Sequence, residues 1–200
     1  MIELQSPAAT AVFAATIATS LLGLYRLPQI INRLVMRPYW IARGKLIETV
    51  ITSGFVHGDM SHLMFNMFTF YFFAFPMERF LGTPKFVVLY LAGLVLSSAC
   101  SVYKHRDNQQ YATLGASGAI SAVLFAYIVY FPMSSLIIFP IPIPIPAALF
   151  AVAYVAYSWW AGQNSQGNIN HDAHLCGALS GLAFVAVSDP AAFRALAGIL

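Results

Sequence analysis

The sequence contains few charged residues. Asp, Glu, Lys and Arg make up only 8% of its 200 residues, whereas soluble domains carry about 25%. None of these residue types occurs between Asp107 and Asp172, 60% of the chain is hydrophobic, and the mean hydropathy is +0.74. This composition does not fit a soluble protein and predicts a polytopic membrane protein. The net charge of +3 is too small and too scattered to indicate a nucleic-acid partner.

Cysteine is also scarce. The two cysteines, Cys100 and Cys176, both lie in apolar segments. A free cysteine in an apolar environment behaves as a small hydrophobic residue. We therefore interpret both as packing residues and expect no disulfide between them. The pair gives no firm indication of the redox compartment.

Six apolar segments predict the fold class, an all-α polytopic membrane protein with six transmembrane helices. A helical run of about 20 apolar residues crosses a bilayer core of about 30 Å. The first run is not a signal peptide, because Glu3 and no Lys or Arg precedes it. We expect one transmembrane domain over residues 1–200. The approximate spans are 8–25, 60–77, 85–103, 115–131, 141–160 and 171–187.

Two connections carry distinctive patterns. Prolines alternate with isoleucines over residues 141–146, and such a run cannot continue a helix. We expect an extended connector that leads into the fifth span. The first loop, residues 26–59, interleaves basic residues with Tyr, Trp and Leu. Beside a membrane this pattern indicates a segment partly embedded in the headgroup layer.

A serine and a histidine stand out among the apolar segments. Ser117 lies in a run of small residues, where serine usually serves close helix packing. His174 shares one helical side with Gly177 and Gly181, at positions i, i+3 and i+7. The two glycines form a GxxxG motif, which permits close approach of helix backbones. If the two segments pack together, an imidazole lies beside a hydroxyl, the minimum for nucleophilic catalysis by serine.

His62 and Asn66 are the other informative polar residues. They are four residues apart and therefore on one helical face, and both are costly to bury in lipid without partners. One interpretation is an interhelical hydrogen bond that serves stability, worth about 0.6 kcal/mol on average in membrane proteins. The other is a pair of donors that face a polar cavity.

In combination these motifs resemble those of the rhomboid family of intramembrane serine proteases. The resemblance covers about residues 57–187. Glu78 and Gly82 are similar to the family's acidic-to-glycine pattern after the second helix, and the Pro-Ile-Pro connector is also common in it. The main matches are HxxxN at 62–66, GxSG at 115–118 and AHxxGxxxG at 173–181.

The resemblance implies hydrolysis of peptide bonds in the transmembrane segments of other membrane proteins, within the lipid bilayer. Ser117 would be the nucleophile and His174 the general base. His62, Asn66 and the backbone N–H of Ser117 would stabilise the oxyanion. The reaction would need no cofactor and no metal ion. Asp172 is an improbable third member, because a residue two positions from His174 faces another side of the helix.

Two positions depart from the family pattern. Many members have an aromatic–arginine pair just before the second helix, where this chain has Glu48 and Thr49. The anchoring of the first loop must therefore differ. Many members also have a tyrosine four residues after the nucleophile, beside the catalytic histidine, where this chain has Ser121. We expect His174 to lose that aromatic neighbour and to be oriented by helix packing or by other side chains.

Other functional classes remain open. A non-catalytic rhomboid-like binder or chaperone of membrane proteins needs the same helices but neither Ser117 nor His174. A metalloenzyme is suggested by four histidines, although their spacing fits no zinc signature. A channel or carrier would more often have charged residues inside its spans. The four histidines are His57, His62, His171 and His174.

Membrane orientation is a point of conflict. In the family's usual arrangement both termini face the cytoplasm, yet the first and third loops would then carry seven of the ten Lys and Arg residues outside. The positive-inside rule favours the opposite orientation. We follow the family, because its motifs are more specific than a charge count. The lack of an extra helix and of a targeting segment favours a bacterial inner membrane. The sequence does not specify an oligomeric state.

Overall fold

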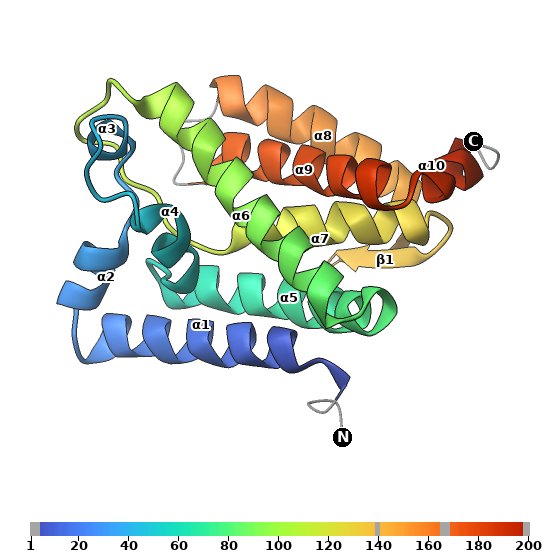
Figure 1. Ribbon diagram of the computed structural model, residues 1–200, viewed down its shortest axis with the longest axis horizontal. Helices are drawn as coiled ribbons and strands as arrows, with labels where there is room; N and C mark the ends of the chain where they lie inside the picture. The colour runs from blue at the N-terminus through green and yellow to red at the C-terminus, as the bar shows by residue number, and fades with distance from the viewer. Residues whose placement is uncertain (1–4, 139–140, 165–168, 198–200) are drawn as a thin grey trace.

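A computed structural model describes residues 5–138, 141–164 and 169–197, and these residues are mostly helical (Figure 1). The long helices are α1 (Pro7–Tyr25), α5 (Met60–Leu81), α6 (Thr83–His105), α7 (Ser117–Tyr130), α8 (Ala147–Asn164) and α9 (His171–Ser188). The shorter elements are α2 (Gln29–Leu34), α3 (Pro38–Ile41), α4 (Thr49–Thr52), η2 (Ser53–Phe55), α10 (Pro190–Ala197), β1 (Ser135–Ile138) and β2 (Ile141–Pro146).

Helix α7 lies at the centre of the bundle and contacts α5, α6, α8 and α9. In Figure 1 these helices run side by side, except for α6, which crosses the others obliquely. Nearly every residue of α7 is buried, and the helix is apolar on all sides rather than along one stripe. A helix of this kind is stable only when neighbours surround it. The sequence therefore places the segment that begins with Ser117 in the interior.

Two of the described helices are long and apolar enough to cross a membrane by themselves, namely α1 and α6. Helix α7 is equally apolar but has only 14 residues. The mostly helical architecture agrees with the expected fold class at this coarser level. Six membrane spans remain a proposal.

The described residues depart from helical structure at β1 and β2, which form a two-stranded antiparallel hairpin, and β2 confirms the extended connector expected over residues 141–146. Ser135 pairs with Pro146 and Leu136 with Ile145, and the register is irregular between Ile137 and Ile138. Successive backbone N–H groups of a strand point to opposite edges, so alternating prolines can share the edge that makes no ladder bonds. The proline run is thus a strand. The fifth long helix begins at Ala147 and not at the expected position 141.

Helix α1 is attached to α5 through a buried carboxylate. Glu78 is only 1% exposed and accepts hydrogen bonds from the backbone N–H groups of Ala8 (3.0 Å) and Ala9 (2.6 Å). It also accepts one from the hydroxyl of Thr83 (2.7 Å). The first N–H groups of a helix have no carbonyl partner within the helix. Since Ser6 makes no side-chain cap bond, Glu78 serves as the N-terminal cap of α1.

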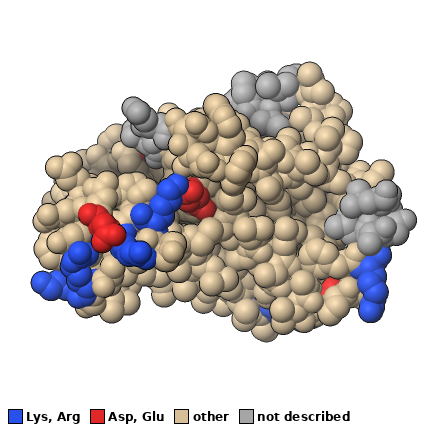
Figure 2. Space-filling model, turned by 90° about the horizontal axis from the view of Figure 1, so that it is seen from above, with Lys and Arg blue, Asp and Glu red and all other residues tan. Residues whose placement is uncertain are grey.

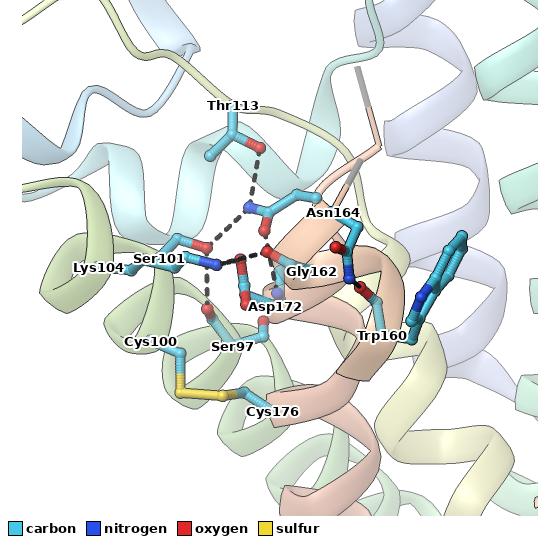
Figure 3. Close-up of polar contacts among 12 residues, drawn as sticks. Ser97, Cys100, Ser101, Lys104, Thr113, Trp160, Gly162, Asn164, Asp172 and Cys176 are labelled. Carbon is cyan, nitrogen blue, oxygen red and sulfur yellow. Dashed lines mark hydrogen bonds and ion pairs between the residues drawn. A yellow bond between two sulfur atoms is a disulfide. The ribbon is translucent and has the colours of Figure 1, made fainter. Parts of the chain in front are cut away.

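The interpretation of the cysteines as unbonded packing residues is wrong. Cys100 of α6 and Cys176 of α9 form a disulfide, with their Cα atoms 6.5 Å apart (Figure 3). The error has a physical reason. The two residues are 76 positions apart in the sequence, and only the packing of α6 against α9 brings them together. The disulfide lies two residues beyond His174.

The first loop is anchored by backbone contacts and by Arg43. Met36 and Thr113 exchange backbone hydrogen bonds of 3.0 and 2.9 Å, which attaches the loop to the segment before α7. Arg43 donates to the carbonyl of Arg106 (2.9 Å) and stacks over the ring of Tyr39. Figure 2 shows most of the visible Lys and Arg side chains at one end of the molecule, where α3 and the last turn of α6 lie in Figure 1. Much of the rest of that face shows neither Lys and Arg nor Asp and Glu side chains (Figure 2).

Candidate active site

Ser117 is the first residue of α7, and its position depends on Gly115. Gly115 has φ +109°, a backbone conformation that favours glycine. Its N–H donates to the carbonyl of Ser53 (2.9 Å), which fixes the approach to the helix. A Cβ at position 115 would lie 2.8 Å from two ring atoms of His62. The glycine is thus required both by the turn and by the neighbouring imidazole. It brings the start of α7 against His62.

His174 reaches the same region because α9 packs directly on α7. A Cβ added at Gly177 would overlap the backbone of Gly118, and one added at Gly181 would overlap the backbone of Ala122. The two helices therefore touch along the glycines of the GxxxG motif, as the shared side of His174 and these glycines predicts. Only glycine permits this separation of the helix axes. The contact holds the first turns of α7 and α9 next to each other.

Asn170 joins the start of α9 to α6 and to the segment before α7. Its side-chain oxygen accepts from the backbone N–H of Ala173 (3.0 Å), which caps the helix. Its amide nitrogen donates to the hydroxyls of Ser101 (2.7 Å) and Thr113 (3.2 Å), two of the side chains drawn in Figure 3. The sequence alone gave no reason to single out Asn170, although an Asn before a helix is a typical cap.

Asp172 does not interact with His174. It accepts from the ammonium group of Lys104 on α6 at 2.6 Å, and Lys104 also donates to the carbonyl of Gly162 (2.8 Å), as Figure 3 shows. Asp172 lies in the first turn of α9, where the helix dipole favours a negative charge. The carboxylate thus links the ends of α6, α8 and α9 rather than orienting the imidazole.

The four residues singled out from the sequence line one pocket. The pocket has a volume of about 560 Å³ and is bordered by His62 and Asn66 from α5, Ser117 from α7 and His174 from α9. A second, more polar cavity of about 640 Å³ shares His62 with it and is bordered by the ends of α6 and α9. The two cavities are neighbours, since Asn170 borders both of them as well.

Hydrogen bonding within the pocket is sparse. Among the described residues, no hydrogen bond joins the hydroxyl of Ser117 to the imidazole of His174. Catalytic hydrogen bonds are often long in the absence of substrate and tighten when it binds. The amide nitrogen of Asn66 donates to the backbone carbonyl of His62 (3.0 Å). Because an amide nitrogen carries two N–H donors, one of them is still available to a ligand.

His57 packs against the ring of His62. It is fully buried, its Nδ1 is 3.0 Å from the hydroxyl of Ser20, and its ring meets that of His62 edge-on at 4.8 Å. Burial and, to a smaller extent, the neighbouring His62 lower the pKa of His57 to about 3, although Asp59 opposes the shift. The imidazole of His57 is therefore neutral at physiological pH. It serves as a packing partner rather than as a charged group.

Position 121 supplies no aromatic neighbour to His174, but another side chain does, in line with the expected orientation by other side chains. Tyr154 of α8 stacks on the imidazole, with ring centres 6.4 Å apart and an angle of 22° between the planes. Its hydroxyl is 2.7 Å from that of Ser121, the residue that stands where many rhomboid sequences have tyrosine. Tyr154 was missed because it lies in another helix, in a segment that looks uniformly apolar and aromatic.

The four histidines that suggested a metalloenzyme form two ring pairs, and one member of each pair borders the pocket. The rings of His57 and His62 are 4.8 Å apart, and those of His171 and His174 are 6.1 Å apart. Within the parts of the chain that the structure describes, no group of three or more His, Cys, Asp or Glu side chains has the arrangement of a metal site.

Comparison with known proteins indicates the family to which this chain belongs. The model of the rhomboid domain matches residues 43–188. RHOMBOID-like protein 12, mitochondrial, of Arabidopsis thaliana is 31% identical over 147 residues, which are 66% of this chain and 44% of that protein. Rhomboid protein 1, mitochondrial, of Saccharomyces cerevisiae is 26% identical over 174 residues, 84% of this chain and 50% of that protein.

The human presenilin-associated rhomboid-like protein, mitochondrial, is 32% identical over 142 residues, 70% of this chain and 38% of that protein. The fold and the pocket define a mostly helical protein with a hydroxyl and an imidazole on one pocket. The chain belongs to the rhomboid family, a family of membrane proteases. It spans half or less of the length of these three curated relatives.

Proposed function

We propose that this protein is an intramembrane serine endopeptidase with a Ser117–His174 dyad. One observation carries the proposal: His62, Asn66, Ser117 and His174, from three different helices, line the same pocket. Structural polar residues would need only a partner on the nearest helix. The convergence of a hydroxyl, an imidazole and two further donors on one cavity instead fits nucleophilic catalysis with a stabilised oxyanion.

In the proposed reaction Ser117 Oγ attacks the carbonyl carbon of the scissile peptide bond. His174 accepts the hydroxyl proton and returns it to the leaving amine as the C–N bond breaks. A water molecule, activated by the same imidazole, then hydrolyses the acyl-enzyme and frees Ser117. The second cavity, with its polar border, supports an entry path for this water from the loop end of the bundle.

The oxyanion of the tetrahedral intermediate would receive hydrogen bonds from His62, from Asn66 and from the backbone N–H of Ser117. That N–H lies in the first turn of α7, where no carbonyl within the helix accepts it. The helix dipole adds positive potential at the same point. Donors of this kind act most strongly when charge develops on the carbonyl oxygen.

The substrates would be transmembrane segments of other membrane proteins. A helical carbonyl is hydrogen-bonded and shielded, so a substrate helix must unwind before Ser117 reaches the scissile bond. Segments with Gly, Pro or polar residues near the cleavage position unwind at lower cost. Such segments are the substrates that we expect.

The dyad is tested with protein purified in detergent and a model transmembrane substrate. We expect Ser117→Ala and His174→Ala each to abolish cleavage while the protein stays folded, and the double variant to be no worse than either. A fluorophosphonate probe should label the wild type at Ser117 and not the Ser117→Ala variant. Near-normal cleavage by either single variant, or absence of labelling in the wild type, contradicts the proposal and favours a non-catalytic binder.

The oxyanion assignment is tested with His62→Ala and Asn66→Ala. Loss of one such donor lowers turnover on the order of 10²–10³ in a soluble serine protease. Because three donors share the charge here, each variant should weaken turnover without eliminating it, and labelling of Ser117 should fall in parallel. If the variants melt at lower temperature but cleave normally per folded molecule, the two side chains are only structural.

For the membrane arrangement we propose six spans formed by the long helices, in one domain, with both termini facing the cytoplasmic side. The pocket and the basic residues of the first loop then lie toward the opposite side, and the embedding of that loop explains why the positive-inside rule fails. A topology reporter fused after Leu200 tests this orientation: activity on the outer side contradicts it.

The relatives' names, which say mitochondrial, give no support to a bacterial inner membrane. That location stays a prediction from the sequence.

A further inference from the structure

The imidazole of His174 has two aromatic neighbours. Among the described residues, neither of its nitrogens has a hydrogen-bond partner. Tyr154 stacks on the ring at 6.4 Å with the planes 22° apart, and His171 meets it edge-on at 6.1 Å. A histidine that works as a general base needs a fixed direction toward the nucleophile. In this protein that direction depends on what fixes its aromatic neighbours.

Two residues of α7 contact Tyr154, one at its hydroxyl and one at its ring. Its hydroxyl is 2.7 Å from the hydroxyl of Ser121, which is only 4% exposed, so water competes little for the bond. Its ring packs against Phe125 of α7 at 5.3 Å and against Phe150 of α8 at 5.6 Å. A hydroxyl bond and ring contacts on the same side chain leave it little rotational freedom.

The residues that hold Tyr154 share a helix with Ser117. Ser121 follows Ser117 by four residues and Phe125 follows Ser121 by four, so all three lie along one face of α7. The face of α7 that presents the Ser117 hydroxyl to the pocket therefore also fixes the ring that lies against His174. Helix α7 thus carries the nucleophile and also contacts the ring that orients the base. No carboxylate beside the imidazole is needed for this arrangement.

We propose that Tyr154 and Ser121 form a positioning pair that holds the His174 imidazole toward Ser117. The pair acts through His174, since the Tyr154 hydroxyl is bonded to Ser121 and its ring stacks on the imidazole. This inference rests on the proposed dyad. Ser121 and Tyr154 also border the pocket, but a role in orienting the base predicts a loss that falls on kcat more than on KM.

The experiment compares Tyr154→Phe, Tyr154→Leu and Ser121→Ala in the purified protein. Tyr154→Phe keeps the stacked ring but loses the hydroxyl, and we expect kcat to fall about tenfold, the effect of one ordinary hydrogen bond. Tyr154→Leu also loses the ring, and we expect a fall of about 100-fold, as for a misplaced catalytic group. KM should change little. Tyr157→Phe, on the same helix but more exposed, is the matched control and should keep wild-type kcat.

A double variant separates positioning from packing. Because Tyr154→Phe and Ser121→Ala break the same hydrogen bond, the double variant should be as slow as either single one. The rate of fluorophosphonate labelling at Ser117 should follow the same order as kcat. A merely structural role predicts something else: lower melting temperatures, with kcat per folded molecule unchanged and with Phe and Leu equivalent at position 154.

Two results overturn the positioning pair. One is wild-type kcat in the folded fraction of both Tyr154 variants, and the other is a double variant in which the two losses multiply. Either result leaves the dyad intact if Ser117→Ala and His174→Ala are inactive. If those two variants cleave normally, the dyad itself fails, and the two failures are thereby distinguished.

Discussion

Replacement of Asn170 should destabilise the start of α9 while leaving Ser117 and His174, the proposed catalytic dyad, unchanged in sequence. Asn170→Ala removes the N-terminal cap of α9, worth about 1 kcal/mol. It also removes the hydrogen bonds to Ser101 and Thr113, worth about 1 kcal/mol each. We therefore expect the free energy of unfolding to fall by about 3 kcal/mol. Since the start of α9 carries His174, kcat should fall as well.

Two further variants make this prediction sharp. Asn170→Ser retains a cap oxygen for the N–H of Ala173 but loses the two bridging bonds, so its loss should be about 2 kcal/mol. Asn164→Ala is the matched control, because its amide donates to the carbonyl of Trp160 within the same helix, on the exposed surface. Its stability should change by less than about 0.5 kcal/mol. The measurements are melting temperature in detergent and turnover of a transmembrane substrate. If Asn170→Ala behaves like Asn164→Ala in both, the bridge does not hold α9.

Three other changes test the packing of the bundle. Gly177→Ala puts a Cβ into the backbone of Gly118, so we expect a loss of about 2–3 kcal/mol and of turnover, measured by melting and cleavage. Glu78→Gln replaces the carboxylate that caps α1, and the melting temperature should fall by the equivalent of about 2 kcal/mol. Cys176→Ser opens a long covalent loop, and the free energy of unfolding should fall by about 4 kcal/mol relative to the oxidised wild type, an effect that a reducing agent should reproduce on the wild type alone.

The parts of the site that are predictable from the sequence are those encoded by short-range spacing. His174 shares a helical side with Gly177, and the structure has that side against α7. His62 and Asn66 are one helical turn apart, and both border the pocket. These relations depend only on the helical repeat, so they are readable without any knowledge of the fold. The apolar character of the chain likewise predicts its mostly helical architecture.

The parts that are not predictable depend on which helices become neighbours. Cys100 and Cys176 meet only because α6 packs on α9, and Glu78 caps a helix that begins about 70 residues earlier. Tyr154 lies 20 residues from His174 in the sequence and on another helix, in a segment with no feature that marks one aromatic residue above the others. Long-range contacts of this kind leave no periodic signal in a single sequence.

The same contacts explain how a hydroxyl and an imidazole can share a site with so few hydrogen bonds between side chains. Helices α7 and α9 meet backbone to backbone at Gly177, and the distance between them is fixed by atoms that have no rotamers to change. Side chains that project from the first turns of two helices at such a separation have little room to diverge. The side-chain torsions of His174 are then limited by ring packing, and Tyr154 stacks on the imidazole. In a lipid environment this arrangement has a physical advantage, because backbone contact and ring stacking require no buried charge.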